Sequence, residues 1–523
     1  MRAIPIPIRC LGRPARLAAA GALAACSTAT PSVAPTPAPA DVRAELRTFV
    51  DSLVEAREWR NAHWGILVVD PERGDTLYSR NAGKLFMPAS NQKLLTGAVA
   101  LARLGPDYRW RTEIGVAAAG AAAANGATAV GDGVLAGDLV VTGTGDPTFS
   151  DHAFSDGMTP LLAIADSLRA RGVRRVAGRL RVGVDHLPGA PLGFGWAWDD
   201  LDFAYSAGVD ELLFNEGFTS VVVHGGARPG EPSRVATRPT RSTPRVESRA
   251  TTVAAGTRRD LDLTRVAGDT AWRLDGTIAA GDSAVINLTH QEPARAFLLA
   301  LHEALATRGI VVEGGVAPAT DTLATGTAVS PLFAVASPTL REVMPLLQKP
   351  SQNQIAELMY RTLGREVAGV GTEDSARRVV ERQLVAWGAD SVGFAVRDGS
   401  GLSRHDYVTP ETIVKVLDAM RRDAHFALFR DALPIAGVDG TIANRMKGTP
   451  AQGNVHAKTG FVDKARSLSG YVTTADGVPL LFSFLANNWT TPTREVERVQ
   501  DAIAVRLASM RLRGGAAVVG GRE

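Results

Sequence analysis

The sequence has very little cysteine: Cys10 and Cys26 are the only two among 523 residues. Because both lie within the first 26 residues, the rest of the chain can form no disulfide. The sequence also lacks the Cys-x-x-Cys and His-Glu-x-x-His spacings of common zinc sites, so no metal or other cofactor is implied. With 45% hydrophobic and 21% charged residues, the composition is that of an ordinary globular protein.

The chain has almost no excess charge, with a formal net charge of +3 that indicates no nucleic-acid partner. Four arginines and no acid lie in residues 1–25. Removing these four from the 57 basic residues leaves 53 against 54 acidic ones, a net charge of −1.

Long apolar runs are also missing. The run nearest the N-terminus, LAAAGALAA at residues 17–25, is too short to remain as a membrane-spanning helix. Together with the basic residues before it, this run predicts an export signal over residues 1–25. It ends in Leu-Ala-Ala-Cys, which resembles the lipobox of bacterial lipoproteins, where the cysteine is lipidated and becomes the new N-terminus. Cleavage of a plain signal peptide at a nearby small residue is the alternative.

We therefore expect an exported, periplasmic protein whose only membrane contact is a lipid on Cys26. Ser27, rather than an acidic residue, follows the cysteine, and this resembles outer-membrane sorting if the host is Gram-negative. Residues 26–41 are rich in proline and alanine and predict an extended tether. Residues 513–523 predict a disordered tail.

Between the tether and the tail, the pattern of residues changes twice. Residues 42–104 predict a helix over 41–59, a strand hairpin over 63–81 and a second helix. Residues 105–331 contain many short strand-like runs and two helical stretches, and 237–256 predict a loop. Residues 332–512 are mostly helical and close with strands at 464–474 and 479–488 and a last helix. We therefore predict one α/β domain, a sheet with helices, split by an inserted α+β region of one or two domains.

A serine and a lysine lie one helical turn apart in MPASNQKLLTGAVALARLG, residues 87–105. Ser90 and Lys93 would share one face of an otherwise apolar helix. Burial lowers the pKa of a lysine, and a neutral amine could remove the proton of Ser90 and create a nucleophile. The alternative is structural: Ser90 starts the helix, and Lys93 extends to water.

Two further short patterns follow in the second half. Ser351-Gln352-Asn353 by itself would be a helix cap, and Lys458-Thr459-Gly460 by itself would be part of a strand and turn. The order Ser-x-x-Lys, Ser-x-Asn, Lys-Thr-Gly is the set found in penicillin-binding proteins and serine β-lactamases.

With these motifs, residues 42–512 resemble the class C low-molecular-mass penicillin-binding proteins, the D-alanyl-D-alanine carboxypeptidase/endopeptidase family. GWAWDDL, VTGTGDPTF, RDGSGLSRHDYVTP and AGVDGTIANRM also look like blocks of this family. The 261 residues from Ser90 to Ser351 are far more than a β-lactamase has there, and they match the family's two inserted domains. The resemblance implies a β-lactamase/transpeptidase-like domain with an antiparallel sheet flanked by helices.

The resemblance also implies acyl transfer at the bond between two D-alanines of a peptidoglycan stem peptide. Ser90 would attack the carbonyl, with Lys93 as its base and Ser351 relaying the proton to the departing amine. Lys458 would keep Lys93 neutral through like-charge repulsion. β-Lactams would then be covalent inhibitors.

The remaining motif residues would bind substrate. Asn353 would hold a substrate amide, Lys458 and Thr459 the terminal carboxylate, and Gly460 would let the substrate backbone approach the strand. The backbone N–H groups of Ser90 and Phe461 would form the oxyanion hole. Phe461 replaces the threonine often found there, which leaves side-chain preference open.

Three smaller expectations complete this interpretation. Gln352 stands where an aspartate is usual, and we expect little catalytic effect from it. The insertion carries none of the three motifs and should shape access to the cleft. His456 could line the cleft, but a place on its rim is favoured, and nothing pairs His405 and Asp406 with a serine.

Two other functions compete with this one. A β-lactamase would need a base for rapid deacylation, which the sequence does not identify. A non-catalytic peptidoglycan-binding lipoprotein would have no need of the intact Ser90 and Lys93.

Overall fold

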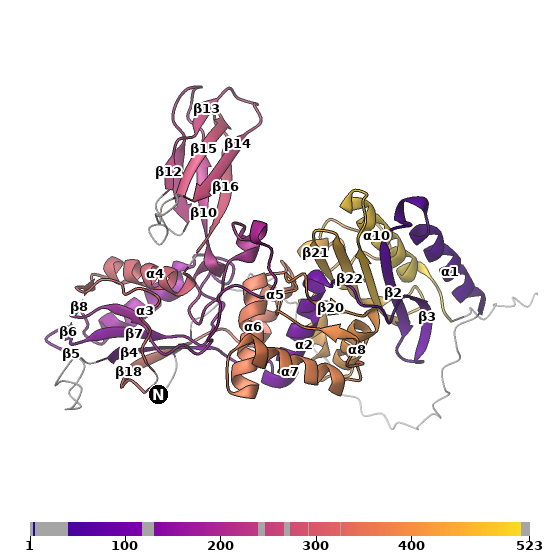
Figure 1. Cartoon of the computed structure of the whole chain (residues 1–523), viewed down its shortest axis with the longest axis horizontal. Helices are drawn as coiled ribbons and strands as arrows, with labels where there is room; N and C mark the ends of the chain where they lie inside the picture. The colour runs from indigo at the N-terminus through magenta and orange to yellow at the C-terminus, as the bar shows by residue number, and fades with distance from the viewer. Residues whose placement is uncertain are drawn as a thin grey trace, which may run out of the picture.

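The computed structural model describes residues 4–5, 40–117, 130–238, 246–265, 272–290, 292–324 and 326–513. The expected lipidation site, the tether up to residue 39 and nearly all of the expected leader and tail lie outside these residues. Figure 1 shows three parts: a sheet with many helices on the right, a smaller α/β part on the left, and a group of strands that projects upward.

The right-hand part is built on a five-stranded antiparallel sheet with the order β21-β22-β23-β2-β3. The hairpin β2 (His63–Asp70) and β3 (Asp75–Arg80) comes from the start of the chain. β21 (His456–Val462), β22 (Ala465–Thr473) and β23 (Pro479–Asn487) come from its end. β2 pairs with β23, so one sheet joins the two ends of the chain, as predicted for a split domain.

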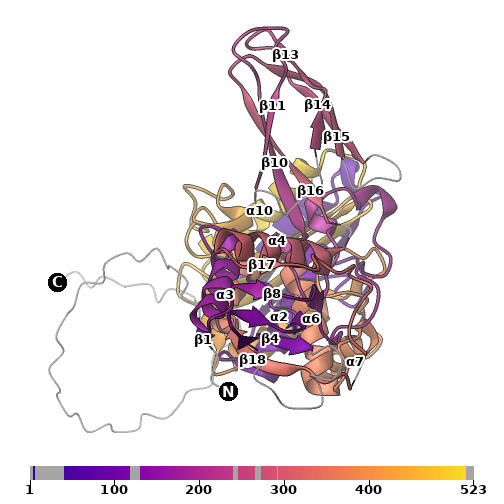
Figure 2. The ribbon, with the colours of Figure 1, turned by 90° about the vertical axis from the view of Figure 1, so that its left-hand side faces the viewer.

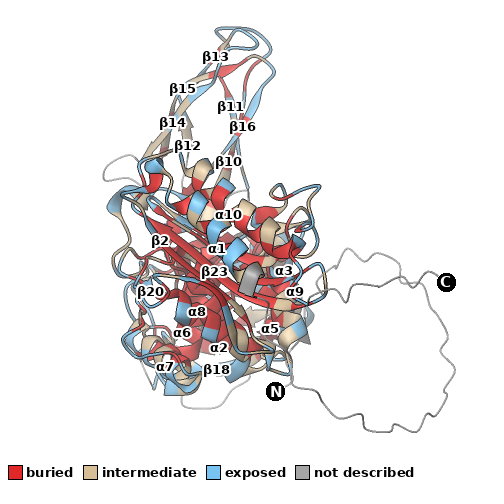
Figure 3. Cartoon of the chain, turned by 90° about the vertical axis from the view of Figure 1, so that its right-hand side faces the viewer, coloured by how far each residue is buried: buried red, intermediate tan, exposed pale blue. Residues whose placement is uncertain are grey.

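Helices cover both faces of this sheet. On one face, α1 (Ala40–Val54) and α10 (Thr493–Ser509) pack on an apolar core with β2 and β23 (Figure 3). The second core, on the opposite face, is formed with helices α2 (Gln92–Leu104), α5 (Leu340–Gln348), α6 (Asn353–Ala368), α7 (Glu373–Ala386), α8 (Pro410–Arg421) and α9 (Phe426–Ala432). A two-stranded sheet of β19 (Phe394–Ala395) and β20 (Tyr407–Val408) lies beside these helices.

Helix α2 runs through the second core. Every residue from Gln92 to Leu101 is buried. Gly97 allows α5 to come close, since a Cβ there would lie 2.7 Å from the Gln348 side chain. Gly105 ends the helix with a φ of +79°, a conformation that favours glycine. The segment that carries Ser90 is therefore joined to a fully packed helix.

The left-hand part of the insertion is an α/β domain. Its sheet has the order β1-β18-β4-β7-β9. These strands are β4 (Arg111–Ala117), β7 (Asp138–Thr142), β9 (Leu180–Val182), β18 (Ser330–Ala336) and the two-residue β1 (Ile4–Pro5) from the expected leader. Helices α3 (Met158–Ala170) and α4 (Pro293–Thr307) share its core. A small second sheet contains β5 (Val130–Gly131), β6 (Val134–Leu135), β8 (Arg175–Val176) and β17 (Val311–Val312).

The expected end of the insertion at residue 331 needs correction. Strand β18 (Ser330–Ala336) contains this position and pairs with β4 up to Ala336. Phe333 and Val335 belong to the core of the inserted domain. The insertion therefore continues about five residues further, because the apolar run after Pro331 completes its sheet.

The projecting part is made of strands alone (Figure 2). β10 (Phe218–His224), β11 (Arg234–Arg238) and β16 (Ser283–Thr289) form one sheet, and β12 (Val246–Ser248), β13 (Thr251–Val253), β14 (Asp260–Arg265) and β15 (Trp272–Ala279) form another. The two sheets enclose a small core. The loop predicted for 237–256 is wrong at β12 and β13, whose three-residue strands are too short to show a period-2 pattern.

No helix within the described residues is long and apolar enough to cross a membrane.

Candidate active site

Ser90 lies in the 3-10 turn η2 (Ala89–Asn91), directly before α2. Ala89 has a φ of +47°, which is strained for a residue with a side chain. The turn is fixed from two sides: Asn91 Nδ2 donates to the Lys458 carbonyl at 2.8 Å, and Ser467 Oγ donates to the Pro88 carbonyl at 2.7 Å. These bonds hold Ser90 against the edge strand β21.

Lys93 is fully buried beneath Ser90. Its Nζ lies 2.9 Å from Ser90 Oγ, 2.6 Å from Asn353 Oδ1 and 2.8 Å from the Ser400 carbonyl oxygen. The expected pairing of Ser90 and Lys93 is therefore present. Because three oxygens surround the amine at hydrogen-bonding distance, the Lys93 side chain has little freedom to move.

Burial lowers the pKa of Lys93 to about 7, while the acids Asp398, Glu357 and Asp406 act in the opposite direction. Of the two expected causes, burial acts on the pKa of Lys93, whereas repulsion from Lys458 is not among the causes. Burial and then the Lys93 ammonium hold the pKa of Lys458 well below its usual range. Because burial removes water from the Lys93 ammonium and lowers its pKa to about 7, Lys93 is partly neutral at neutral pH.

The three acids lie in a buried cluster that the sequence did not reveal. Asp398 accepts hydrogen bonds from the backbone N–H groups of Ser400 and Gly401, at 3.1 and 2.6 Å. Glu357 Oε1 accepts from the Ser400 N–H at 2.8 Å, and burial, with Asp398 next, raises the pKa of Glu357 to about 8. The cluster therefore fixes the segment whose Ser400 carbonyl contacts Lys93.

Asp406 completes this cluster rather than a catalytic triad. Its Oδ1 accepts from the Arg397 N–H at 2.6 Å, and its buried Oδ2 has no hydrogen-bond partner among the described residues. Burial and then Asp398 raise the pKa of Asp406 well above the usual range. The inserted domain also takes part, since Trp196 Nε1 donates to Asp398 Oδ2 at 3.0 Å.

The Ser351-Gln352-Asn353 motif lies at the start of α6. Ser351 has a φ of +67°, a second strained residue in the site. Asn353 is the first residue of α6, and its amide joins Lys93 to the insertion: Oδ1 faces Lys93, and Nδ2 donates to the Tyr205 carbonyl at 2.6 Å. Asn353 therefore positions the lysine as well as facing the cleft.

The Lys458-Thr459-Gly460 motif lies in β21. Lys458 is fully buried and donates to the Thr459 carbonyl at 3.1 Å. Thr459 Oγ1 lies 2.7 Å from Thr441 Oγ1. A Cβ on Gly460 would lie 2.6 Å from the Pro88 carbonyl oxygen and 2.9 Å from Ser90 N. Only glycine therefore lets the strand approach Ser90 this closely.

These motifs meet at a cleft of about 890 Å³. Five predicted site residues line it: Ser90, Ser351, Asn353, Thr459 and Phe461. Lys93 and Lys458 are buried beneath the cleft wall. The insertion contributes His152, Asp199, Asp200, Tyr205, Glu216 and Phe218 to the lining.

His456 does not belong to this lining. It is half-buried, and its Nδ1 lies 3.3 Å from the Arg430 carbonyl oxygen, away from the nucleophile. His405 uses its backbone N–H to bind Ser403 Oγ at 3.2 Å. Among the described residues, neither histidine forms a hydrogen bond with Ser90.

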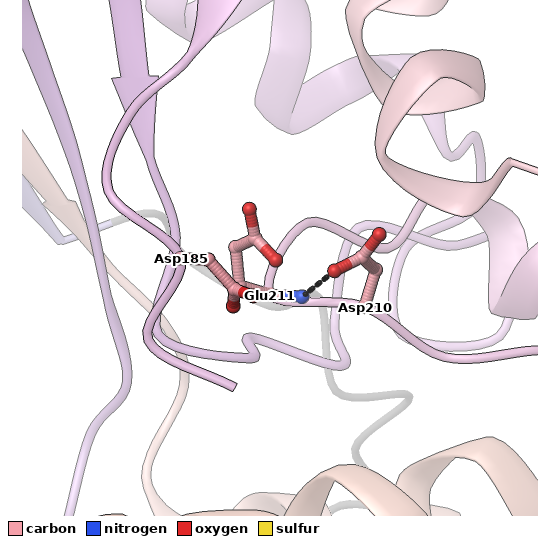
Figure 4. Close-up of side chains that lie close together, drawn as sticks. All are labelled: Asp185, Asp210 and Glu211. Atoms are coloured by element: carbon pink, nitrogen blue, oxygen red, sulfur yellow. Dashed lines mark hydrogen bonds between the residues drawn. The ribbon is translucent and has the colours of Figure 1, made fainter. Parts of the chain in front are cut away.

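One group of acids outside the cleft has the geometry to hold a metal ion. Asp185, Asp210 and Glu211 of the insertion each offer an oxygen, and these oxygens lie within 4.8 Å of one another (Figure 4). Burial raises the pKa of Glu211 to about 10, so the group can reduce its charge by holding a proton. The cluster does not line the cleft, and acyl transfer does not need it.

Comparisons with known proteins identify the family of this chain. The model of the D-Ala-D-Ala carboxypeptidase 3 (S13) family matches residues 46–510. A D-alanyl-D-alanine carboxypeptidase of Actinomadura sp. (strain R39) is 36% identical over 484 residues, covering 89% of this chain and 84% of the relative. The D-alanyl-D-alanine carboxypeptidase DacB of Haemophilus influenzae is 24% identical over 441 residues, which are 82% of this chain and 86% of that relative.

Among solved structures, penicillin-binding protein 4 (dacB) of Haemophilus influenzae matches with a TM-score of 0.75. At 21% identity, with 88% of this chain and 99% of that chain covered, this match shows the shared fold. The family match covers most of the chain, and the Actinomadura relative is similar over nearly its whole length. The chain therefore belongs to the D-Ala-D-Ala carboxypeptidase 3 (S13) family and is a serine-type D-Ala-D-Ala carboxypeptidase.

Proposed function

We propose that Ser90 forms an acyl-enzyme with the D-Ala-D-Ala end of a peptidoglycan stem peptide and that Lys93 is the base. The observation that carries this proposal is the 2.9 Å contact between Lys93 Nζ and Ser90 Oγ, made by a fully buried lysine with a pKa of about 7. A base must be within hydrogen-bond reach and neutral when it acts, and this amine meets both requirements.

In the first step, Lys93 accepts the Ser90 proton while Oγ bonds to the carbonyl carbon between the two D-alanines. The oxyanion is stabilised by the backbone N–H groups of Ser90 and Phe461, each contributing about 3–4 kcal/mol. The carbon–nitrogen bond then breaks, and Ser351 relays the proton to the leaving amine. Water hydrolyses the Ser90 ester in the second step and restores the enzyme.

Thr459 and Lys458 bind the substrate's terminal carboxylate in this proposal. In the free site, burial and then Lys93 hold the pKa of Lys458 well below its usual range. An arriving carboxylate favours the charged ammonium and would raise this pKa. The ammonium would thus favour substrates that end in a free carboxylate.

Mass spectrometry of purified muropeptides before and after incubation tests the activity. Loss of one terminal D-alanine from pentapeptides marks carboxypeptidase action, and separation of cross-linked dimers marks endopeptidase action. We expect the first, with the second as a further activity of the same cleft. Unchanged muropeptides together with rapid turnover of penicillin would instead identify a β-lactamase.

The proposal also includes export and a lipid on Cys26. We predict that the wild-type protein fractionates with membranes through several acyl chains on Cys26, since a single chain binds only weakly. Cys26→Ala should release the protein, because this lipid would be its only membrane contact. Membrane fractionation and mass spectrometry of the N-terminus check this. A soluble wild-type protein with an unmodified N-terminus would contradict the lipoprotein assignment.

A further inference from the structure

The insertion places one strained loop directly against the active-site helix. Asn215, Glu216 and Gly217 have consecutive φ values of +47°, +58° and +77°. This conformation is strained for Asn215 and Glu216, which carry side chains, and it persists only where the surroundings fix it. Hydrogen bonds do so here: the Asn215 N–H donates to the Phe149 carbonyl at 2.7 Å, and Asn215 Nδ2 donates to the Phe218 carbonyl at 3.0 Å.

This backbone conformation places the Glu216 carboxylate at the cleft wall. Glu216 is only 6% exposed. Its Oε2 accepts from Gln352 Nε2 at 2.5 Å, and its Oε1 lies 2.9 Å from His152 Nδ1. Ser150 Oγ lies 3.4 Å from the same oxygen. A buried carboxylate is costly unless it is paired. His152 and Ser150 belong to the insertion, whereas Gln352 belongs to the motif at the start of α6.

Gln352 transmits this contact to α6. Its Oε1 accepts from the backbone N–H groups of Gln354 and Ile355, at 2.6 and 3.4 Å, so the side chain caps the helix. The same amide therefore joins Glu216 at one end to the helix N-terminus at the other. Ser351, with its strained φ, and Asn353, which contacts Lys93, are the residues on either side.

We propose that Glu216 is a positioning residue for acylation: through Gln352 it fixes Ser351 and Asn353 at the N-terminus of α6. This inference rests on the roles proposed above for those two residues. It changes two expectations from the sequence. Gln352 has an indirect effect on catalysis, and the insertion supports the catalytic residues as well as shaping access to them.

Exchanging the two side chains tests this role without creating a cavity. Gln352→Glu places two carboxylates together and removes the donor, so we expect acylation by a labelled penicillin to slow by about tenfold or more. Glu216→Gln keeps an oxygen acceptor but loses the charge, so a smaller loss is expected. In the double variant, the amide at 216 donates to the carboxylate at 352, and the rate should recover to within about threefold of wild type.

Two quantities are measured for each variant: the acylation rate at saturating penicillin, and the penicillin concentration that gives half of this rate. Disturbed positions of Ser351 and Asn353 should lower the rate, with little change in half-saturation. Glu231 supplies a matched control, since it accepts from the Ala227 N–H at 2.8 Å in the loop between β10 and β11 and does not line the cleft. Glu231→Gln should leave the rate unchanged and should not rescue Gln352→Glu.

A double variant that is no faster than Gln352→Glu would overturn the inference, as would wild-type acylation by Gln352→Glu. Both results would leave the proposed function intact, because wild-type labelling and its loss in Ser90→Ala test that function separately. Thermal unfolding of each variant distinguishes a positional effect from loss of the fold: recovery of rate without recovery of stability supports positioning.

Discussion

Replacing Ser90 with alanine should abolish covalent labelling by a fluorescent penicillin and lower hydrolysis of a D-Ala-D-Ala peptide by roughly 10⁴-fold or more. The substitution removes only the side-chain hydroxyl group, and the oxyanion hole keeps its backbone donors. Gel-based labelling and release of D-alanine measure the two losses.

The fold should survive this change, because Ser90 is only partly buried and the bonds that fix its turn come from Asn91 and Ser467. Thermal unfolding close to wild type provides the control. Labelling that persists in Ser90→Ala would move the nucleophile elsewhere and would contradict the assignment of the whole motif.

Lys93→Arg should lower the acylation rate by about 10²–10⁴-fold, the usual contribution of a general base. A guanidinium keeps the positive charge but does not deprotonate in proteins, so it cannot accept the Ser90 proton. The rate of penicillin labelling at saturation measures the effect.

A companion variant, Lys93→Met, removes the charge while keeping a long unbranched side chain, and we expect a similar loss. If both variants fold and label at near wild-type rate, Lys93 is structural. Arginine is larger than lysine and can disturb packing at this fully buried position, whereas methionine fits more easily. A loss of rate in both variants therefore reports loss of the base rather than loss of packing.

Much of the fold could be predicted from local patterns. The predicted hairpin at 63–81 matches β2 and β3, and the closing strands match β22 and β23. These segments are apolar enough, and bounded clearly enough by turns, for periodicity to identify them. Strands β12 and β13 were missed because each has three residues and obtains its stability by pairing with β15.

The site was predictable in its residue types but less so in its contacts. Ser90 and Lys93 are three residues apart, so helical geometry alone brings them together. The contact of Lys93 with Asn353 crosses 260 residues, and that of Glu216 with Gln352 crosses 136. Such contacts depend on how the domains pack, which no local pattern encodes. The same holds for the acids Asp398, Glu357 and Asp406, which lie together in one buried cluster only in the folded chain.

The acid cluster makes the pH dependence of acylation informative. Asp398, Glu357 and Asp406 raise the pKa of Lys93 against the larger effect of burial. Asp398 is the largest of these opposing causes, so Asp398→Asn should lower the pKa of Lys93 and move the midpoint to lower pH. If the midpoint instead reported the ionisation of Glu357, whose pKa is raised to about 8, Glu357→Gln would abolish the pH dependence.

The most direct measurement is the acylation rate of the wild-type protein by a labelled penicillin from about pH 5 to pH 10. An ordinary lysine has a pKa near 10.4, and fewer than about one in a thousand would be neutral at pH 7. With a pKa of about 7, Lys93 loses its proton within the measured range, so the rate should rise with pH through one ionisation near 7 and then level off. A rate that is independent of pH, or one that is still rising steeply at pH 10, would contradict Lys93 as the base.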